Sequence, residues 1–373
     1  MLNGVGAAAT GLCSAMLLFG RLAPFDGVLG FVLIAYLVFL AAYALLTSLT
    51  DDAPAVRDNV MTVLMWTAAV AAFGGLVDVV CVILWRGHTA LGHTNFFTQD
   101  MSRTGPLQPL SSGGIKHALV GTLWVISIAL AITVPLGLSA AIYLNEVGGH
   151  LARTVRTIVD AMTALPSIVA GLFIYATLVI TLHQKNGLFA AVAVSIVMLP
   201  IIIRSSDVVL RLVPGNLREA SAALGAPQWR TVWHVVLPTA RSGLATSVIL
   251  GMARGLGETA PVLLTAGFTA SLNTNPLHGP MVSLPLEAFE LVQNSSRAYQ
   301  ARGFATAAFL MLVVLALFVV ARILGGRGPG HISRRQAGRI IRRSARDASR
   351  FEARSLQPLH RSQTGEGPDV QLA

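Results

Sequence analysis

The sequence predicts an all-α polytopic membrane protein, and three observations lead to that class. Only 12% of the 373 residues are charged and 54% are hydrophobic, whereas a soluble domain carries about 25% charged residues. The apolar residues stand in long blocks, as expected when a spanning helix needs roughly 20 of them in a row. The net charge of +10 is concentrated near the C-terminus and in short loops, which is typical of the cytoplasmic face of a membrane protein.

Eight apolar segments are long enough, or nearly so, to cross a bilayer. In chain order they are residues 5–20, 28–46, 60–85, 119–143, 161–182, 188–203, 243–267 and 304–324. Pro135 lies inside the fourth and Pro166 near the start of the fifth, and a membrane helix tolerates proline where neighbouring groups satisfy the freed carbonyl. We therefore expect about six core spans preceded by two extra N-terminal spans.

The topology follows from the charges. The tail 326–373 is rich in arginine, which places it in the cytoplasm, where we expect it to be partly helical and able to touch anionic headgroups. Eight spans then put the N-terminus in the cytoplasm as well. The basic loop 204–242 lies on the same side, and the polar segments 86–114 and 268–302 face outward.

Three regions follow from this layout. Residues 1–59 form an N-terminal extension with two spans, 60–325 form the core with the cytoplasmic loop 204–242, and 326–373 form the basic tail. Cys13 and Cys81 lie in apolar segments, where we expect them to be small buried hydrophobes.

The cytoplasmic loop contains a short helix with signals at both ends. Asn216 is a good N-cap, and Glu219 three residues later suggests a capping box. Gly225 stands where a left-handed residue ends a helix, and Pro227 prevents continuation. We expect a second helix to start at Pro227 and to end at Leu237-Pro238.

That second helix carries apolar residues at helical spacing. They are Trp229, Val232, Trp233 and Val236. Such a stripe beside Arg230 and His234 predicts a helix that lies in the membrane interface.

The same loop resembles the signature loop of binding-protein-dependent ABC permeases of type I importers. The residues that match at fixed spacing are Glu219, Ala220, Gly225, Val235, Leu237 and Pro238. Ser221 replaces the usual second alanine and Val235 the usual isoleucine. The resemblance implies that the short helix docks into a groove of an ATPase subunit, and it assigns the coupling role to Glu219, Ala220, Gly225, Leu237 and Pro238.

Three further stretches narrow the resemblance. Residues 164–172 (ALPSIVAGL), 199–204 (LPIIIR) and 253–261 (ARGLGETAP) are similar to the PstA family of phosphate ABC permeases rather than to the companion PstC. The similarity covers roughly residues 60–325. It implies inorganic phosphate as cargo, a PstC-like second permease, two PstB-like ATPase subunits and a PstS-like extracytoplasmic phosphate-binding protein.

Arg254 and Glu258 are the strongest candidates for a substrate pathway. They are four residues apart in a segment apolar enough to span, where an ionisable side chain costs at least about 2.5 kcal/mol. An arginine grips a tetrahedral oxyanion through its two-pronged guanidinium, and Gly255 and Gly257 would allow a close approach. A purely structural ion pair is the alternative. Arg204 is a third candidate, although an arginine at the end of a span also extends to the interface without a function.

No phosphate-cradling G-x-x-x-x-G-K-[ST] sequence is present, and the chain has two lysines, Lys116 and Lys185. We therefore expect no ATPase activity and no cofactor, with ATP and Mg bound by partner subunits. Sulfate or molybdate is the alternative cargo. An ion-coupled transporter or channel is disfavoured because no repeat is evident and Asp78 and Glu258 are too few carboxylates. A membrane-embedded enzyme is disfavoured because no catalytic or metal-binding spacing occurs.

Overall fold

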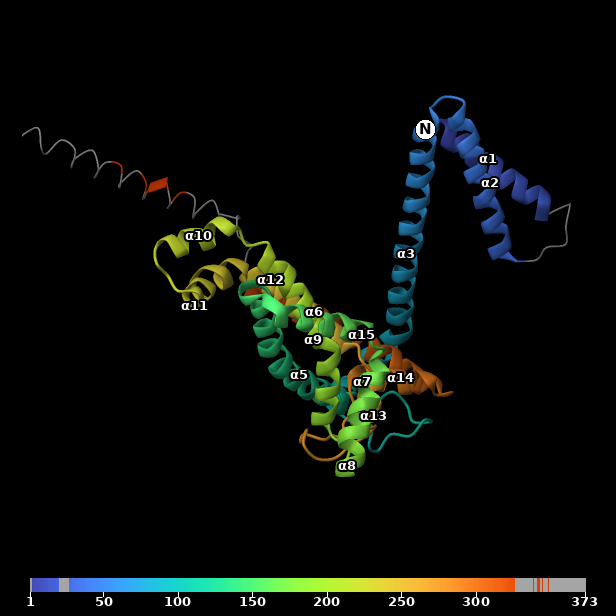
Figure 1. Ribbon diagram of the computed structural model, residues 1–373. Helices are drawn as coiled ribbons and strands as arrows, with labels where there is room; N and C mark the ends of the chain where they lie inside the picture. The colour runs from blue at the N-terminus through green and yellow to red at the C-terminus, as the bar shows by residue number, and fades with distance from the viewer. Residues whose placement is uncertain are drawn as a thin grey trace, which may run out of the picture. The chain divides into compact units, whose positions relative to one another are not determined.

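The computed structural model describes residues 2–19 and 27–325, together with five isolated positions after residue 337 (Figure 1). Every regular element in these residues is helical, which confirms the all-α class. The chain divides by packing into two compact units, residues 1–86 and 87–373. That division falls inside a helix. The boundary expected at residue 59 stays a prediction, and the arginine-rich tail lies outside the described residues apart from isolated positions.

The first unit contains α1 (Leu2–Leu17), α2 (Val28–Ser48) and the first part of α3 (Ala53–Leu91). α1 and α2 pack closely, because a Cβ on Gly11 would lie 2.6 Å from the carbonyl oxygen of Ala35. The two helices therefore form a hairpin that depends on a small residue at the crossing.

A hydrogen bond between side chains joins α2 to α3 in the first unit. The hydroxyls of Tyr36 on α2 and Thr67 on α3 are 2.5 Å apart and share a hydrogen bond. Asp78 is exposed on α3. Cys13 and Cys81 are also exposed, so the expectation that they are buried was wrong: apolar neighbours in the sequence predict lipid as readily as a protein core.

The core unit consists of the end of α3 and twelve further helices in the described ranges. These are α4 (Asn95–Thr98), α5 (Lys116–Ile142), α6 (Gly149–Ala164), α7 (Ser167–Ile174), α8 (Ile180–Leu182), α9 (Gly187–Arg211), α10 (Gly215–Ala223), α11 (Gln228–Thr231), α12 (Leu237–Leu256), α13 (Ala260–Thr265), α14 (Leu284–Gln293) and α15 (Arg297–Gly325). Three π-helical turns extend or join them, Tyr143–Val147 after α5, Tyr175–Val179 between α7 and α8, and Val232–Val236 between α11 and α12.

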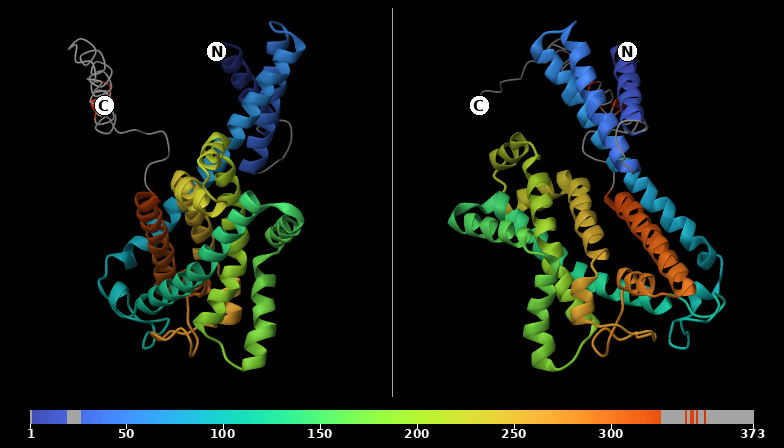
Figure 2. Two further views of the ribbon diagram at one scale, coloured as in Figure 1. Left: turned by 60° about the vertical axis from the view of Figure 1, so that its left-hand side comes forward. Right: turned by 90° about the vertical axis from the view of Figure 1, so that its right-hand side faces the viewer.

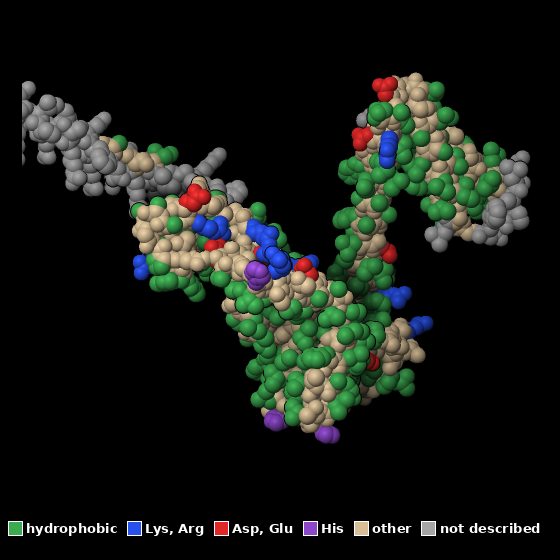
Figure 3. All heavy atoms as spheres, viewed as in Figure 1, with side chains coloured by type: hydrophobic (Ala, Val, Ile, Leu, Met, Phe, Trp, Pro, Cys, Tyr) green, Lys and Arg blue, Asp and Glu red, His purple; other side chains and the backbone are tan. Residues whose placement is uncertain are grey.

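Helix α9 is the centre of the core unit and packs against both α5 and α12 (Figure 2). Its residues Ala190, Val194 and Met198 are fully buried in the main apolar cluster. α5 and α9 begin at the same end, because ideal Cβ atoms on Gly121 and Gly187 would both lie within 3 Å of the Met281 side chain. In the view of Figure 3, charged side chains gather at the opposite end, around α6 and α10, and the spans next to them are mostly hydrophobic.

Within the described residues, six helices are long and apolar enough to cross a membrane, and a seventh is counted if the bent pair α6–α7/α8 is one span. The remaining predicted segment, 5–20, forms the shorter apolar helix α1. The fifth predicted span, 161–182, is not continuous. Leu165 and Pro166 are extended, and the helices on either side bend by 103°, because a proline disfavours helical backbone in the residue before it.

The seventh predicted span, 243–267, was wrong at both ends. The observed span is Gln228–Leu256, and Leu237-Pro238 does not interrupt it. Pro238 has no backbone N–H, so it cannot donate a helical hydrogen bond. It lies in the first turn of α12, and the π-helical turn just before it changes the hydrogen-bond pattern so that no donor is needed there. The expected separate interfacial helix is therefore the start of a span.

Two polar segments expected to be loops are partly helical. α3 continues through Arg86 to Leu91, so the loop expected from residue 86 starts later. The expected outer loop 268–302 contains α14 and the first turn of α15. α14 is only 10 residues long, and its apolar side is buried at Leu284, Leu286 and Leu291. A helix this short gives little periodic signal, because packing rather than propensity stabilises it.

The two segments that were expected to be outer loops are joined to each other. The Asp100 carboxylate accepts hydrogen bonds from the Ser102 hydroxyl at 2.7 Å and the Leu272 backbone at 3.0 Å. The Ser102 hydroxyl, above all, lowers the pKa of Asp100 below its usual range. Because the pKa of this carboxyl is lower in the folded state than in the unfolded chain, where it is about 3.9, the ionised group stabilises the fold above that pH. This stabilisation is lost as the pH falls through the pKa of the folded state. The loops therefore stay joined at neutral pH.

Candidate functional site

Arg254 and Glu258 form an ion pair, with Arg254 Nη1 and Glu258 Oε1 2.9 Å apart. The two side chains differ in environment, since Glu258 is 4% exposed and the Arg254 side chain 52%. The spacing of four residues correctly placed them together. Glu258 is not in the helix, however, because α12 ends at Leu256 and α13 begins at Ala260. A buried carboxylate thus holds one side of a guanidinium whose other side is open.

The two glycines near this break have different functions. A Cβ on Gly255 would lie 2.4 Å from Met198 Sδ, so this glycine allows α12 to approach α9. Gly257, the residue after α12, is exposed, and a Cβ there would meet only the Arg254 carbonyl oxygen, at an ordinary contact distance of 3.8 Å. Only Gly257 therefore fits the expectation that a ligand could come close at this point.

Arg204 lies on α9 and is paired with a residue that the sequence did not indicate. Its Nε donates to Asp160 Oδ1 at 2.9 Å, and its Nη2 bonds the same oxygen. Both side chains are about half exposed. Met198 contacts Gly255, and Arg204 is six residues further along α9, which is about 9 Å along the helix axis. The structure therefore places Arg204 and Arg254 at different depths and does not bring them together.

The short helix expected in the 204–242 loop is present as α10, but it starts differently from the expectation. Its N-cap is Pro214 without a side-chain cap, so Asn216 and Glu219 do not form a capping box. Glu219 and Ala220 are exposed on α10. The polar side chains are thus free to meet a partner instead of capping their own helix.

The end of α10 confirms that Gly225 is the left-handed residue that terminates this helix. Its φ is +76°, and its N–H donates to the Ala222 carbonyl at 2.9 Å, while Ala226 N–H donates to the Ser221 carbonyl at 3.2 Å. These two bonds form a Schellman motif, which needs a left-handed residue at this position. The exact ending of α10 is therefore determined by one glycine.

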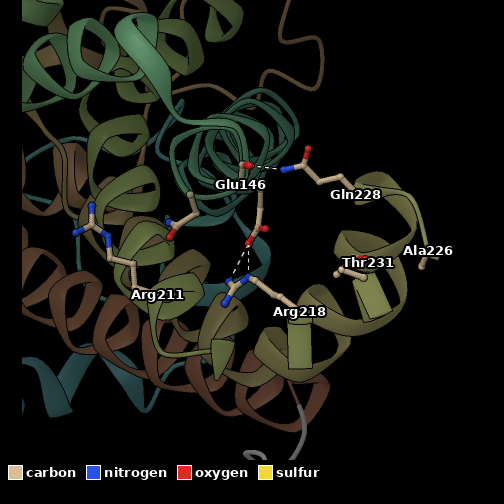
Figure 4. A pocket seen from close by; sticks show the side chains of 8 residues that line it. Glu146, Arg211, Arg218, Ala226, Gln228 and Thr231 are labelled. Carbon is tan, nitrogen blue, oxygen red and sulfur yellow. Dashed lines mark hydrogen bonds and ion pairs between the residues drawn. The ribbon is translucent and has the colours of Figure 1, made fainter. Parts of the chain in front are cut away.

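A cleft of about 620 Å³ lies beside α10 and shows how the helix is anchored (Figure 4). Arg218 Nη2 donates to Glu146 Oε1 at 2.8 Å, and Glu146 lies in the π-helical turn that ends α5. Gln228 donates to the Glu146 backbone carbonyl. Arg218 Nη1 also donates to the Val213 carbonyl at 2.8 Å. Hydrogen bonds and an ion pair therefore connect α10, and Gln228 that follows it in the loop, to the end of α5.

The segment after α10 presents two faces. Val232 and Val236 are buried, whereas Trp229 and Trp233 are more than half exposed. Leu237 packs against the apolar cluster that contains Val236, and Pro238 is exposed. Leu237 thus fixes the base of α12.

Three buried ionisable residues at the end of the core unit where α5 and α9 begin were missed from the sequence. His117 Nε2 and Glu287 Oε2 are 3.3 Å apart, and each side chain is at most 1% exposed. Arg302 is equally buried, and its Nη2 donates to the carbonyls of Pro109 at 2.7 Å and Ser112 at 2.8 Å. Polar composition had suggested an exposed loop. A charged residue within the predicted loop gives no sign of burial unless its packing partner is known.

We expect Arg302→Met to destabilise the outer end of the core unit. Methionine keeps much of the apolar stem but leaves the carbonyls of the 109–112 segment without their donor, which costs about 2 kcal/mol. Thermal unfolding in detergent should show a lower midpoint for Arg302→Met and no change for the matched control Arg297→Met, an exposed position on the same helix. Equal midpoints for the two variants would contradict this role.

No group of three or more His, Cys, Asp or Glu side chains that could hold a metal ion occurs among the described residues. Several charged groups are instead paired with one of opposite sign, namely Arg254 with Glu258, Arg204 with Asp160 and Arg218 with Glu146. The arrangement can hold an anion at a half-exposed guanidinium and can transmit movement between α10 and the spans.

The chain is similar in sequence to a family of transport proteins and to several of its members. Residues 133–327 match the family described as "Binding-protein-dependent transport system inner membrane component". The phosphate transport system permease protein PstA 1 of Mycobacterium tuberculosis (strain CDC 1551 / Oshkosh) is 38% identical over 271 residues, which are 72% of this chain and 88% of that protein. PstA of Haemophilus influenzae is 32% identical over 269 residues, 72% of this chain and 93% of that protein.

Among solved structures, a chain of the inward-facing MetNI methionine ABC transporter is similar to this chain, with a TM-score of 0.43 and 19% identity. The similarity covers 57% of this chain and 93% of that chain.

Proposed function

The chain belongs to the family of binding-protein-dependent transport system inner membrane components, and from this premise we propose that it carries inorganic phosphate inward. Family membership confirms the predicted class, a multi-pass permease subunit of an ABC importer. It is the membrane component and not the ATPase, so ATP is bound by a partner.

Arg254 carries the proposal for the cargo. Its guanidinium is half exposed in a membrane-spanning segment and held on one side by the buried Glu258. A charge in that position is costly and typically faces a pathway. A guanidinium binds the oxygens of a phosphate through two parallel hydrogen bonds. The relatives whose names include phosphate transport support the choice of phosphate over sulfate or molybdate.

Transport is driven through α10. In our proposal its exposed face, with Glu219 and Ala220, docks on an ATPase subunit, and Gly225 keeps the helix end rigid. Leu237 and Pro238 fix the adjoining base of α12. Closure of the ATPases on ATP then moves α10, the Arg218–Glu146 pair moves the end of α5, and the access of the pathway alternates between the two sides.

The remaining partners and the orientation complete the proposal. A homologous PstC-like permease forms the other half of the pathway, two PstB-like ATPases bind the cytoplasmic side, and a PstS-like protein delivers phosphate from outside. α10 and the C-terminal end of α15 lie in the cytoplasm. The N-terminus lies there as well if α1 and α2 both cross the membrane.

Uptake into vesicles tests the function. We expect proteoliposomes that contain the chain, its second permease and the ATPase subunits to accumulate labelled phosphate when ATP and the binding protein are present. Liposomes without the ATPase, and liposomes given sulfate or molybdate, are the controls. ATP-independent uptake would exclude an ABC importer, and uptake of sulfate or molybdate in place of phosphate would assign the cargo to the alternative.

A further inference from the structure

Both arginines that the sequence indicates as pathway candidates, Arg254 and Arg204, are paired with a carboxylate. Glu258 is four residues from Arg254, but Asp160 is 44 residues from Arg204 and reaches it from another helix. Arg204 bonds Asp160 through two nitrogens, Nε and Nη2. An anion that binds Arg204 must therefore displace or share the position of the Asp160 carboxylate.

The position of Asp160 is fixed by packing on one side. The preceding Val159 is buried against Ile203, the residue before Arg204, in a small apolar cluster between α6 and α9. The ion pair thus lies at the edge of an apolar contact. Its two side chains remain about half exposed, so the pair can be opened without unpacking the helices.

The helix bend connects this pair to the other arginine site. Asp160 lies five residues before Leu165, where the chain turns by 103° into α7. α7 packs on α13, since a Cβ on Gly171 would lie 2.7 Å from Pro261 Cα. Pro261 is three residues after Glu258. On one side of the bend, α6 therefore contacts Arg204 through Asp160. On the other side, α7 contacts α13, which begins two residues after Glu258.

Asp207, the other nearby acidic residue, is engaged elsewhere. Its carboxylate accepts from Asn145 at 2.6 Å and from Arg211 at 2.8 Å, and Arg156 lies 3.6 Å away. Asp160 is therefore the acidic group assigned to Arg204 among the described residues.

We propose that Asp160 is a positioning residue for transport, which holds Arg204 until the passing oxyanion replaces it and which restores the pair when the anion leaves. This inference rests on the proposed phosphate transport. Forming a half-exposed ion pair favours the paired over the unpaired state by about fivefold at most. The oxyanion can therefore replace the Asp160 carboxylate at Arg204. Asp160 then limits how long the anion is retained, and through the bend its release is linked to α7 and the Arg254–Glu258 site.

The test measures retention and uptake separately. In Asp160→Asn, Arg204 loses its competing carboxylate, so the purified complex should retain about fivefold more labelled phosphate, while the maximal rate of uptake into proteoliposomes falls. Asp160→Glu should behave like the wild type. Arg153→Gln, which removes an exposed charge from the same helix, is the matched control. A purely structural pair would lower assembly and uptake without raising retention.

Exchanging the two charged residues distinguishes the positioning role of Asp160 further from a purely structural role. In the double variant Asp160→Arg with Arg204→Asp, the pair can form again but the guanidinium is on α6. We expect normal assembly with deficient uptake, and full uptake would overturn the proposal, as would unchanged or lower retention in Asp160→Asn. Wild-type liposomes run in parallel: if they take up no phosphate, the proposed function fails, whereas wild-type uptake with an unaltered Asp160→Asn overturns only the role of Asp160.

Discussion

Phosphate uptake is expected to be abolished in Arg254→Ala, while the complex still assembles and hydrolyses ATP. In our proposal, the guanidinium is the group that offers two parallel hydrogen bonds to an oxyanion inside a span. Losing both costs about 3 kcal/mol, which is about a hundredfold in rate. Uptake of labelled phosphate into proteoliposomes measures the loss, and co-purification of the partner subunits measures assembly.

Two further variants control this experiment. Arg254→Ala leaves the buried Glu258 without its partner, which alone can destabilise the fold, so Arg254→Lys is the second test. Lysine keeps the charge but lacks the planar fork, and we expect it to retain assembly with only partial uptake. Arg241→Ala, an exposed arginine in the first turn of the same helix, should transport normally. Wild-type uptake in Arg254→Ala would remove this residue from the pathway.

Gly225→Val is expected to uncouple ATP hydrolysis from uptake. The residue has a φ of +76°, and a Cβ there would meet nothing within 4 Å. The effect therefore comes from the backbone alone, because a β-branched residue in left-handed conformation costs of order 1–3 kcal/mol. Relief of that strain unwinds the end of α10 and breaks the Schellman bonds. We expect hydrolysis to continue while the phosphate transported per ATP falls about tenfold.

Gly215→Val is the matched control, since it introduces the same side chain at the other end of α10, also with open space but without a positive φ. It should remain coupled. Gly225→Asn should restore part of the coupling, because asparagine tolerates the left-handed region. Full coupling in Gly225→Val would show that a rigid end of α10 is not needed to transmit the movement.

The features that could be predicted from the sequence are those that depend on near neighbours. Apolar runs located the spans because lipid imposes a length and a composition on each one separately. Gly225 and the Arg254–Glu258 pair were found because a helix end and a four-residue spacing are local. The resemblance in the 216–238 loop supplied the family, which physical patterns alone would have left open.

What could not be predicted depends on how distant segments meet. Asp160 reaches Arg204 because α6 packs against α9, and no spacing in the sequence encodes that contact. Arg302 is buried against loop carbonyls almost two hundred residues earlier in the chain. The polar composition of its own segment had instead suggested exposure. The continuity of Gln228–Leu256 was missed because a π-helical turn accommodates Pro238, a device that leaves no clear pattern.

The common starting end of α5 and α9 has a practical consequence. The two lysines of the chain, Lys116 and Lys185, stand immediately before or at the start of these helices, on the side away from α10. Reagents that acylate amines can therefore modify side chains of this subunit from one face of the membrane only. In the orientation and assembly that we propose, cross-linkers that join lysines will report on contacts with the delivery protein outside. They will be silent about the ATPase, for which arginine- or carboxylate-directed chemistry is required.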